Sequence, residues 1–166
     1  MAYGNRGKTD SLTTVYDSEV YPVGSVFVQP ADELVADESL QGDRTWLFVE
    51  SDGGCTANAL LKRSSNTASY KATDSSASNA TELMNLIGIA NHAISTGKYG
   101  WIIVKGETSV LGAVAVTNGN NLISTSGGAG KCKPATGGAT DSFAVFGRAI
   151  ETTGGAATVK CYVDFR

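Results

Sequence analysis

The chain has 166 residues and a formal net charge of −3 at pH 7, and charged residues make up only 17% of it. That length allows one domain or two small ones, and it can bury a core without covalent staples. The acidic balance argues against a nucleic-acid partner, because such proteins need a basic patch against the phosphates. No segment approaches the ~18 apolar residues of a membrane helix, and the polar N-terminus lacks the apolar region of a signal peptide, so we expect neither a membrane partner nor secretion.

The composition favours strands joined by turns, because glycine is abundant at 20 residues and serine and threonine are frequent. Residues 1–20 are polar and predict an extended N-terminal arm, which is either a disordered tail or a segment that orders on a neighbouring subunit. Residues 21–166 are expected to form a β-rich domain that divides into two related halves, at about 21–95 and 96–166.

In the first half, apolar and β-branched runs predict strands at 23–28, 44–49 and 59–62, and Pro30 ends the first of them. Residues 64–80 are rich in serine, threonine, alanine and asparagine. They predict either a long surface loop or a strand with polar faces.

Residues 81–94 fit two structures. Leu83, Leu86, Ile87, Ala90 and Ile94 fall near helical spacing. A glycine inside the run, and its similarity to a glycine-rich segment further along, favour a strand at 86–94 instead. A short helix over 81–94 is the alternative.

The second half shows clearer turn signals, above all Asn118-Gly119, which is typical of a tight β-hairpin. The expected elements are a strand at 99–105, a turn at 106–107, a strand at 110–117, a strand at 121–125, a glycine-rich loop at 126–140, and a closing hairpin of 143–151 and 157–165 that turns at 154–155.

Two pairs of similar segments indicate a duplication. Residues 46–49 read Trp-Leu-Phe-Val and residues 101–104 read Trp-Ile-Ile-Val, about 55 positions apart. A Gly-x-Ala step occurs at 88–90 and again at 147–149, about 59 positions apart. The sequence therefore predicts an all-β fold, a β-barrel or β-sandwich built from two related β units.

One segment imitates a phosphate-binding loop. Residues 125–132 end in Gly-Lys-Cys, but the pattern requires glycine where Thr125 stands and a hydroxyl residue where Cys132 stands. Pro134 follows, so no helix N-terminus completes an anion site. A loop that is mobile or contacts a partner is the better interpretation.

No other pattern predicts chemistry. His92 is the single histidine, and nothing near it resembles a nucleophile elbow. The acidic residues at 32–38 lack calcium-loop spacing, and His and Cys are too scattered for zinc. We therefore predict no enzyme, with no catalytic residue, no cofactor or cofactor-binding residue and no metal ligand.

The three cysteines are dispersed and predict free thiols, although Cys132 and Cys161 could pair if neighbouring strands bring them together. Trp46 and Trp101 are expected in the core. An alternative is that Trp46, Trp101, Tyr99 and Tyr162 line a platform for a sugar or a partner.

A series of glycine and apolar motifs resembles a known family. Its most recognisable part is Gly97-Lys98-Tyr99-Gly100-Trp101 leading into Val104-Lys105-Gly106, and other parts lie at 22–25, 42–49, 87–94, 121–124 and 147–151. Over roughly residues 20–165 the chain resembles capsid decoration, or cement, proteins of tailed bacteriophages.

The resemblance implies a non-catalytic virion protein, assembled in the host cytoplasm, that sits on the capsid surface. It implies binding to the major capsid protein lattice, stabilisation of the head and self-association as a homotrimer. A tail, fibre or host-surface adhesin module with a β-rich fold, able to bind sugar, is the alternative function.

Overall fold

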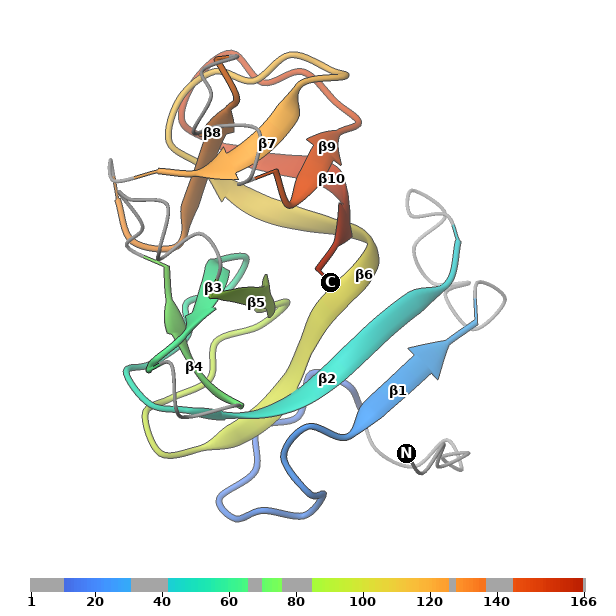
Figure 1. The fold of residues 1–166 in the computed structure, drawn as a ribbon, viewed down its shortest axis with the longest axis vertical. Helices are drawn as coiled ribbons and strands as arrows, with labels where there is room; N and C mark the ends of the chain where they lie inside the picture. The colour runs from blue at the N-terminus through green and yellow to red at the C-terminus, as the bar shows by residue number, and fades with distance from the viewer. Residues whose placement is uncertain are drawn as a thin grey trace.

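The computed structural model describes residues 11–30, 42–65, 70–75, 85–125, 128–136 and 145–165. Within these ranges every regular element is a β-strand (Figure 1). The strands are β1 (Val26–Gln29), β2 (Arg44–Ser51), β3 (Leu60–Arg63), β4 (Lys71–Asp74), β5 (Leu86–Ile89), β6 (Tyr99–Gly112), β7 (Asn121–Ser124), β8 (Lys131–Pro134), β9 (Gly147–Ala149) and β10 (Thr158–Asp164).

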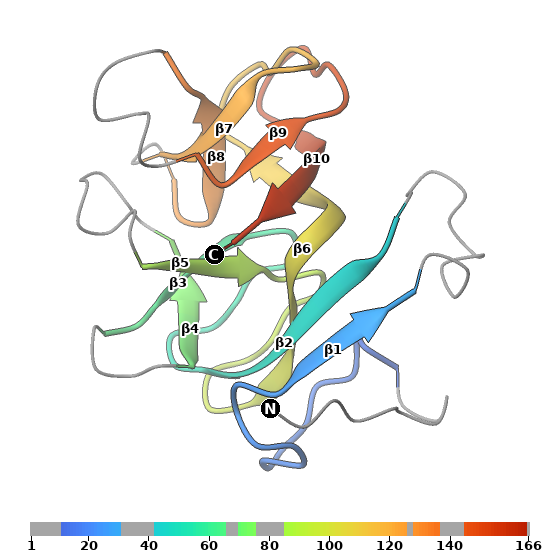
Figure 2. The same ribbon diagram turned by 45° about the vertical axis from the view of Figure 1, so that its right-hand side comes forward.

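The strands close into two barrels that share β6. The first barrel runs β2-β4-β3-β5-β6 and closes where β6 pairs with β2. The second runs β6-β10-β9-β7-β8 and closes where β8 pairs with β6. In Figure 1 the long β6 rises from the first barrel, at the bottom, into the second, at the top, and the turned view of Figure 2 keeps this separation.

The two barrels have the same topology. β2 is parallel to β4 and antiparallel to β6, and in the second barrel β6 is parallel to β8 and antiparallel to β10. The remaining pairs, β3–β4, β3–β5 and β5–β6, correspond to β7–β8, β7–β9 and β9–β10. The prediction of an all-β fold built from two related units is confirmed.

Matching hydrogen bonds fix the alignment of the repeat. The isolated bridge Cys55–Ile94 corresponds to the bridge Val116–Thr153, a shift of 61 residues for the first partner and 59 for the second. The two Gly-x-Ala steps are therefore equivalent, as predicted. Gly88 and Gly147 each lie against a neighbouring strand, where an added Cβ would come within 2.8 Å of the Ile103 carbonyl oxygen and 2.6 Å of the Tyr162 carbonyl oxygen.

The two tryptophan segments are not equivalent copies, and this part of the prediction is wrong. They lie on β2 and β6 of the same barrel, where Trp46 pairs with Ile103 and Phe48 pairs with Trp101. Their likeness reflects a shared environment, because the two strands line one buried aromatic face.

The expected turn at 106–107 is also wrong, since β6 continues from Tyr99 to Gly112 as one strand. Gly106 lies where the strand changes partners, because Lys105 pairs with Thr45 of β2 while Val163 of β10 pairs with Gly106 itself. Its φ of +109° is a conformation that favours glycine, and it lets the strand pass from one barrel to the other.

Three predictions around the second barrel need correction. The Asn118-Gly119 turn forms, with Asn120 N–H donating to the Thr117 carbonyl at 3.0 Å, but it does not join a hairpin, because β7 pairs with β8 and β9. The expected strand at 110–117 ends at Gly112. The expected loop at 126–140 contains β8, whose first two residues pair with the end of β6 and close the second barrel.

The remaining predicted elements agree better. β5 is a strand, and residues 85–94 contain no helix, whereas 81–84 lie outside the described residues. Part of the polar segment 64–80 forms a short strand, β4, whereas residues 66–69 and 76–80 lie outside the described residues. The closing hairpin forms, with Cys161 opposite Ala149, although residues 143–144 lie outside the description.

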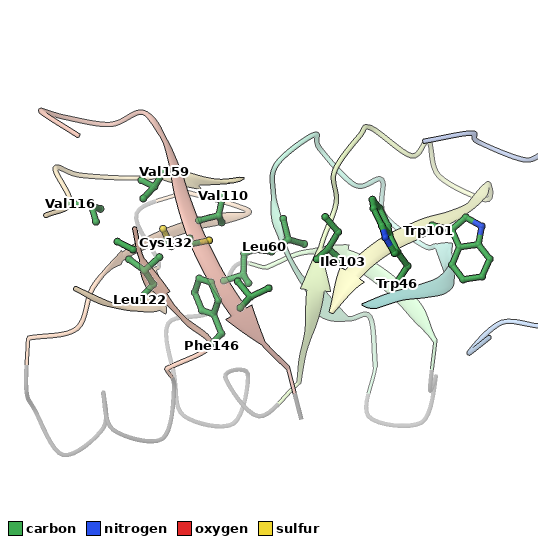
Figure 3. Packing of buried hydrophobic residues seen from close by; sticks show 14 of the residues in the cluster. Trp46, Leu60, Trp101, Ile103, Val110, Val116, Leu122, Cys132, Phe146 and Val159 are labelled. Atoms are coloured by element: carbon green, nitrogen blue, oxygen red, sulfur yellow. The ribbon is translucent and has the colours of Figure 1, made fainter. Parts of the chain in front are cut away.

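Two apolar clusters make up the core. One fills the first barrel and includes Val49, Leu61 and Ile102. The larger runs from Val116 in the second barrel through Leu60 to Trp101 beside the first (Figure 3). Each such fully buried aliphatic side chain stabilises the fold by roughly 1.5–3 kcal/mol. Because the larger cluster spans both barrels, it fixes them against each other.

Candidate interaction surface

The described part of the N-terminal arm packs on its own chain. Tyr16 forms an antiparallel bridge with Tyr99, with N–H···O distances of 2.9 and 3.0 Å. The Tyr21 ring lies 5.4 Å from Phe48 and 5.5 Å from Trp101, measured between ring centroids. This segment therefore covers the aromatic face of β2 and β6, while residues 1–10 lie outside the description.

The tryptophans belong to the core, as predicted. Trp46 and Trp101 are each 2% exposed. Trp46 Nε1 donates to Gln29 Oε1 at 3.0 Å. Tyr99 stacks on Phe48, with a centroid distance of 6.2 Å and an interplanar angle of 14°. These three rings do not form an exposed platform, and of the four candidate residues Tyr162 alone is exposed.

Residues 126–127 of the phosphate-loop imitation lie outside the described residues, and its part at 128–132 forms a junction between the barrels. Gly130 N–H donates to the Ser75 carbonyl at 2.6 Å, and the Gly130 carbonyl accepts from Leu60 N–H at 2.8 Å. Ser75 and Ser124 hydroxyls are 2.8 Å apart and buried. An anion-binding loop directs its N–H groups at the ligand, whereas Gly130 directs its own into the protein.

The three cysteines are buried free thiols, as predicted, and Cys132 and Cys161 form no disulfide. Burial raises the pKa of Cys55 to about 11 and that of Cys132 to about 12, and it raises the pKa of Cys161 as well. A thiol reacts as the thiolate, so these side chains act as small apolar residues.

His92 follows β5 and is half-buried, with neither ring nitrogen hydrogen-bonded. Burial lowers its pKa below the ordinary value of 6.5. Nε2 lies near Gly100, where an added Cβ would come within 3.3 Å of it. Among the described residues, no carboxylate or hydroxyl orients the ring, as a catalytic histidine requires.

Charged side chains form pairs at the surface of the first barrel. Lys71 Nζ lies 2.8 Å from Glu50 Oε1, and Lys98 Nζ lies 2.9 Å from Asp17 Oδ1. The Lys98 pairing lowers the pKa of Asp17. Across the described ranges, no group of three or more His, Cys, Asp or Glu side chains could hold a metal ion. The same ranges contain no helix able to cross a membrane.

The most distinctive exposed feature is the free edge of β1, which sequence reasoning missed. β1 begins the strand order, and within the described ranges β2 is its only strand partner. Val26 and Val28 on this strand are 38% and 42% exposed. The signal was the Val-Phe-Val alternation, which is typical of a half-buried strand but does not show which edge stays unpaired. Other large exposed apolar residues are Val15, Val20, Tyr70, Val114, Val145 and Tyr162.

Comparison with known proteins finds a similar fold but no similar sequence. No protein-family model and no curated protein matches the chain. Among solved structures, the chain is similar to the head fiber gp8.5 N base in bacteriophage phi29, with a TM-score of 0.51 and 15% identity. The match covers 73% of this chain and 94% of that one. At this level of identity the similarity shows that the two chains share a fold.

Proposed function

We propose that this protein is a structural component of a bacteriophage head that binds the outer surface of the major capsid protein lattice and stabilises it. The fold shared with nearly the whole phi29 head fiber N base is the observation that carries the proposal. The sequence resemblance to capsid decoration proteins, which does not depend on that fold comparison, also points to a bacteriophage head.

The placement of the reactive side chains supports a binding role. Cys55, Cys132 and Cys161 are buried, and the Gly130 N–H is used within the fold. In the part of the chain that the structure describes, His92 has no orienting partner. The two barrels are joined by a common strand and a common core, so the described strands form one rigid body. Such a body can bind across neighbouring capsid subunits without changing shape.

The stabilising effect would follow from repetition. Contacts that are weak singly give high occupancy when symmetry repeats them over a shell. Because the protein would bind the mature shell and not its precursor, mass action would favour the mature state. The family resemblance also implies homotrimers, and native mass spectrometry measures that expectation directly.

The alternative, a tail or host-surface adhesin, has less support. It relied on exposed aromatic side chains such as Trp101 and Tyr99, yet Trp101 is buried beneath Tyr21 and Tyr99 stacks on Phe48. Gold-labelled antibody against the protein should decorate heads. Labelling confined to tails would contradict the head assignment.

The decisive experiment uses heads that lack the protein. We expect the purified protein to sediment with mature heads at hundreds of copies each, to leave precursor shells unbound, and to raise the temperature of DNA release. Failure to sediment with mature heads, together with an unchanged release temperature, would refute the proposal.

A further inference from the structure

We infer that the free edge of β1 is a self-association site, where β1 pairs antiparallel with β1 of a second copy. β1 lies at the outside of the molecule, with β2 on its one paired side (Figures 1 and 2). Among the described residues no strand pairs with the other side. The inference concerns the chain itself and does not depend on the proposed capsid role.

The register shows which backbone groups face outward. Phe48 N–H donates to the Ser25 carbonyl at 2.9 Å, so Ser25 directs its carbonyl toward β2. Hydrogen-bonding direction alternates along an antiparallel strand, and Phe27 and Gln29 therefore also face β2. The N–H and C=O groups of Val26 and Val28 face away from β2. Another extended strand is the partner that satisfies groups spaced in this way.

The side chains leave this edge unprotected. Phe27 packs toward the core, 6.3 Å from Trp101 between ring centroids, and Gln29 accepts the Trp46 hydrogen bond. Val26 and Val28 project from the other face and stay exposed. Soluble proteins usually protect an edge strand with a charge, a proline or a bulge within it, and the four residues of β1 include none of these.

The sequence of this segment is complementary to itself. Residues 25–29 read Ser-Val-Phe-Val-Gln, so a two-fold axis at Phe27 places each valine opposite a valine. It also places Phe27 opposite Phe27, and the polar Ser25 opposite Gln29. No like charges meet, and the outward groups of Val26 bond those of Val28 in the second copy. A closed two-fold contact uses one surface twice, as this segment allows.

The first test compares assembly masses by light scattering after size exclusion. Val28→Lys places a charge opposite the apolar Val26 of the second copy and diagonally across from the same substitution there, so we expect the wild-type assembly to have twice the mass of the V28K assembly. Val114→Lys is the matched control, because Val114 is 48% exposed on the second barrel, and its mass should equal that of the wild type. Equal masses for wild type and V28K, with unchanged unfolding temperatures, would overturn the inference.

The second test fixes the register by cross-linking. Val26 would face Val28 of the second copy as a hydrogen-bonded pair, about 5.5 Å apart between Cα atoms, a spacing that a disulfide can span. A mixture of Val26→Cys and Val28→Cys chains should cross-link on mild oxidation, whereas each variant alone should not. The buried native thiols keep the background low. No cross-linking in the mixture, or cross-linking as strong in either variant alone as in the mixture, would overturn this pairing.

Discussion

Asn58 and Gly119 occupy the same position in the two barrels. Both have left-handed backbones, with φ of 60° and 88°. Asn58 N–H donates to the Ala90 carbonyl at 2.6 Å, and Gly119 N–H donates to the Ala149 carbonyl at 2.9 Å. The turn before β3 and the turn before β7 therefore have the same backbone conformation. Asparagine and glycine are the two residue types that tolerate this conformation best.

Substitutions at this pair should follow backbone preference. Asn58→Gly should leave stability nearly unchanged, and Asn58→Ala should cost about 1 kcal/mol, because alanine is strained in the left-handed region. Gly119→Ala should cost a similar amount. Urea unfolding monitored by tryptophan fluorescence measures the free energy of unfolding of all three variants. An Asn58→Ala protein as stable as wild type would show that the turn is not held in this conformation.

Gly106 should be highly sensitive to substitution. A Cβ there would lie 2.6 Å from the Asp43 carbonyl oxygen in a backbone with φ of +109°, so Gly106→Ala should cost about 3 kcal/mol or more. Gly97→Ala is the matched control, because Gly97 also has a positive φ but nothing within 4 Å, and it should cost about 1 kcal/mol. Equal losses in thermal unfolding would contradict the idea that β6 needs glycine where it changes partners.

The duplication shows what the sequence could and could not predict. The Gly-x-Ala steps were found because a glycine at a close strand contact leaves a fixed local pattern at 88–90 and 147–149. The tryptophan segments gave a false alignment, because Trp46 and Trp101 share a buried face and not a position in the repeat. The sequence therefore predicts local features such as a glycine at a close contact, but it does not predict which strands pair.

The same limit explains the errors at β6 and β8. Gly106-Glu107 has the composition of a turn, and its role as a crossing point depends on β2 and β10, which are distant in sequence. Lys131–Pro134 became a strand because the end of β6 was available for parallel pairing. The exposed edge of β1 could not be predicted either, since an edge is defined by a neighbour that is missing.

The three thiols should be inert in the folded protein. With the pKa of Cys55 at about 11 and that of Cys132 at about 12, almost no thiolate exists at pH 8, and burial excludes reagent. We expect a disulfide reagent to modify no thiol over minutes at pH 8, and all 3 in guanidinium. Cys55→Ala should lower the unfolded count by one. Rapid labelling before unfolding would contradict the buried placement of these residues.

His92 should make stability depend on pH. Its folded pKa is lowered by burial, so below the unfolded value of about 6.5 the unfolded chain binds the proton more readily. The stabilisation is thus complete above pH 6.5 and is lost as the pH falls through the folded pKa. Unfolding free energies of wild type and His92→Gln should therefore converge or cross between pH 8 and pH 5. A pH-independent difference between the two would contradict a buried neutral imidazole.

Ring packing, and not the ion pair, should hold the N-terminal segment in place. Tyr16 lies 5.9 Å from Phe48 and 6.1 Å from Tyr21 between ring centroids, and it also bridges Tyr99. Tyr16→Ala should cost about 2 kcal/mol, less than a fully buried aromatic, and should speed proteolysis within residues 11–25. Tyr16→Phe keeps the ring contacts and should resemble the wild type.

Asp17→Asn is the comparison for the ion pair, because the Asp17 side chain is 91% exposed and its contact with Lys98 is screened by water. Its unfolding midpoint and cleavage rate should stay close to those of the wild type. If Asp17→Asn released the segment while Tyr16→Ala did not, charge would be the main restraint. The aromatic face of Phe48 and Trp101 would then stay covered only at low salt, so cleavage of the wild type would rise with ionic strength.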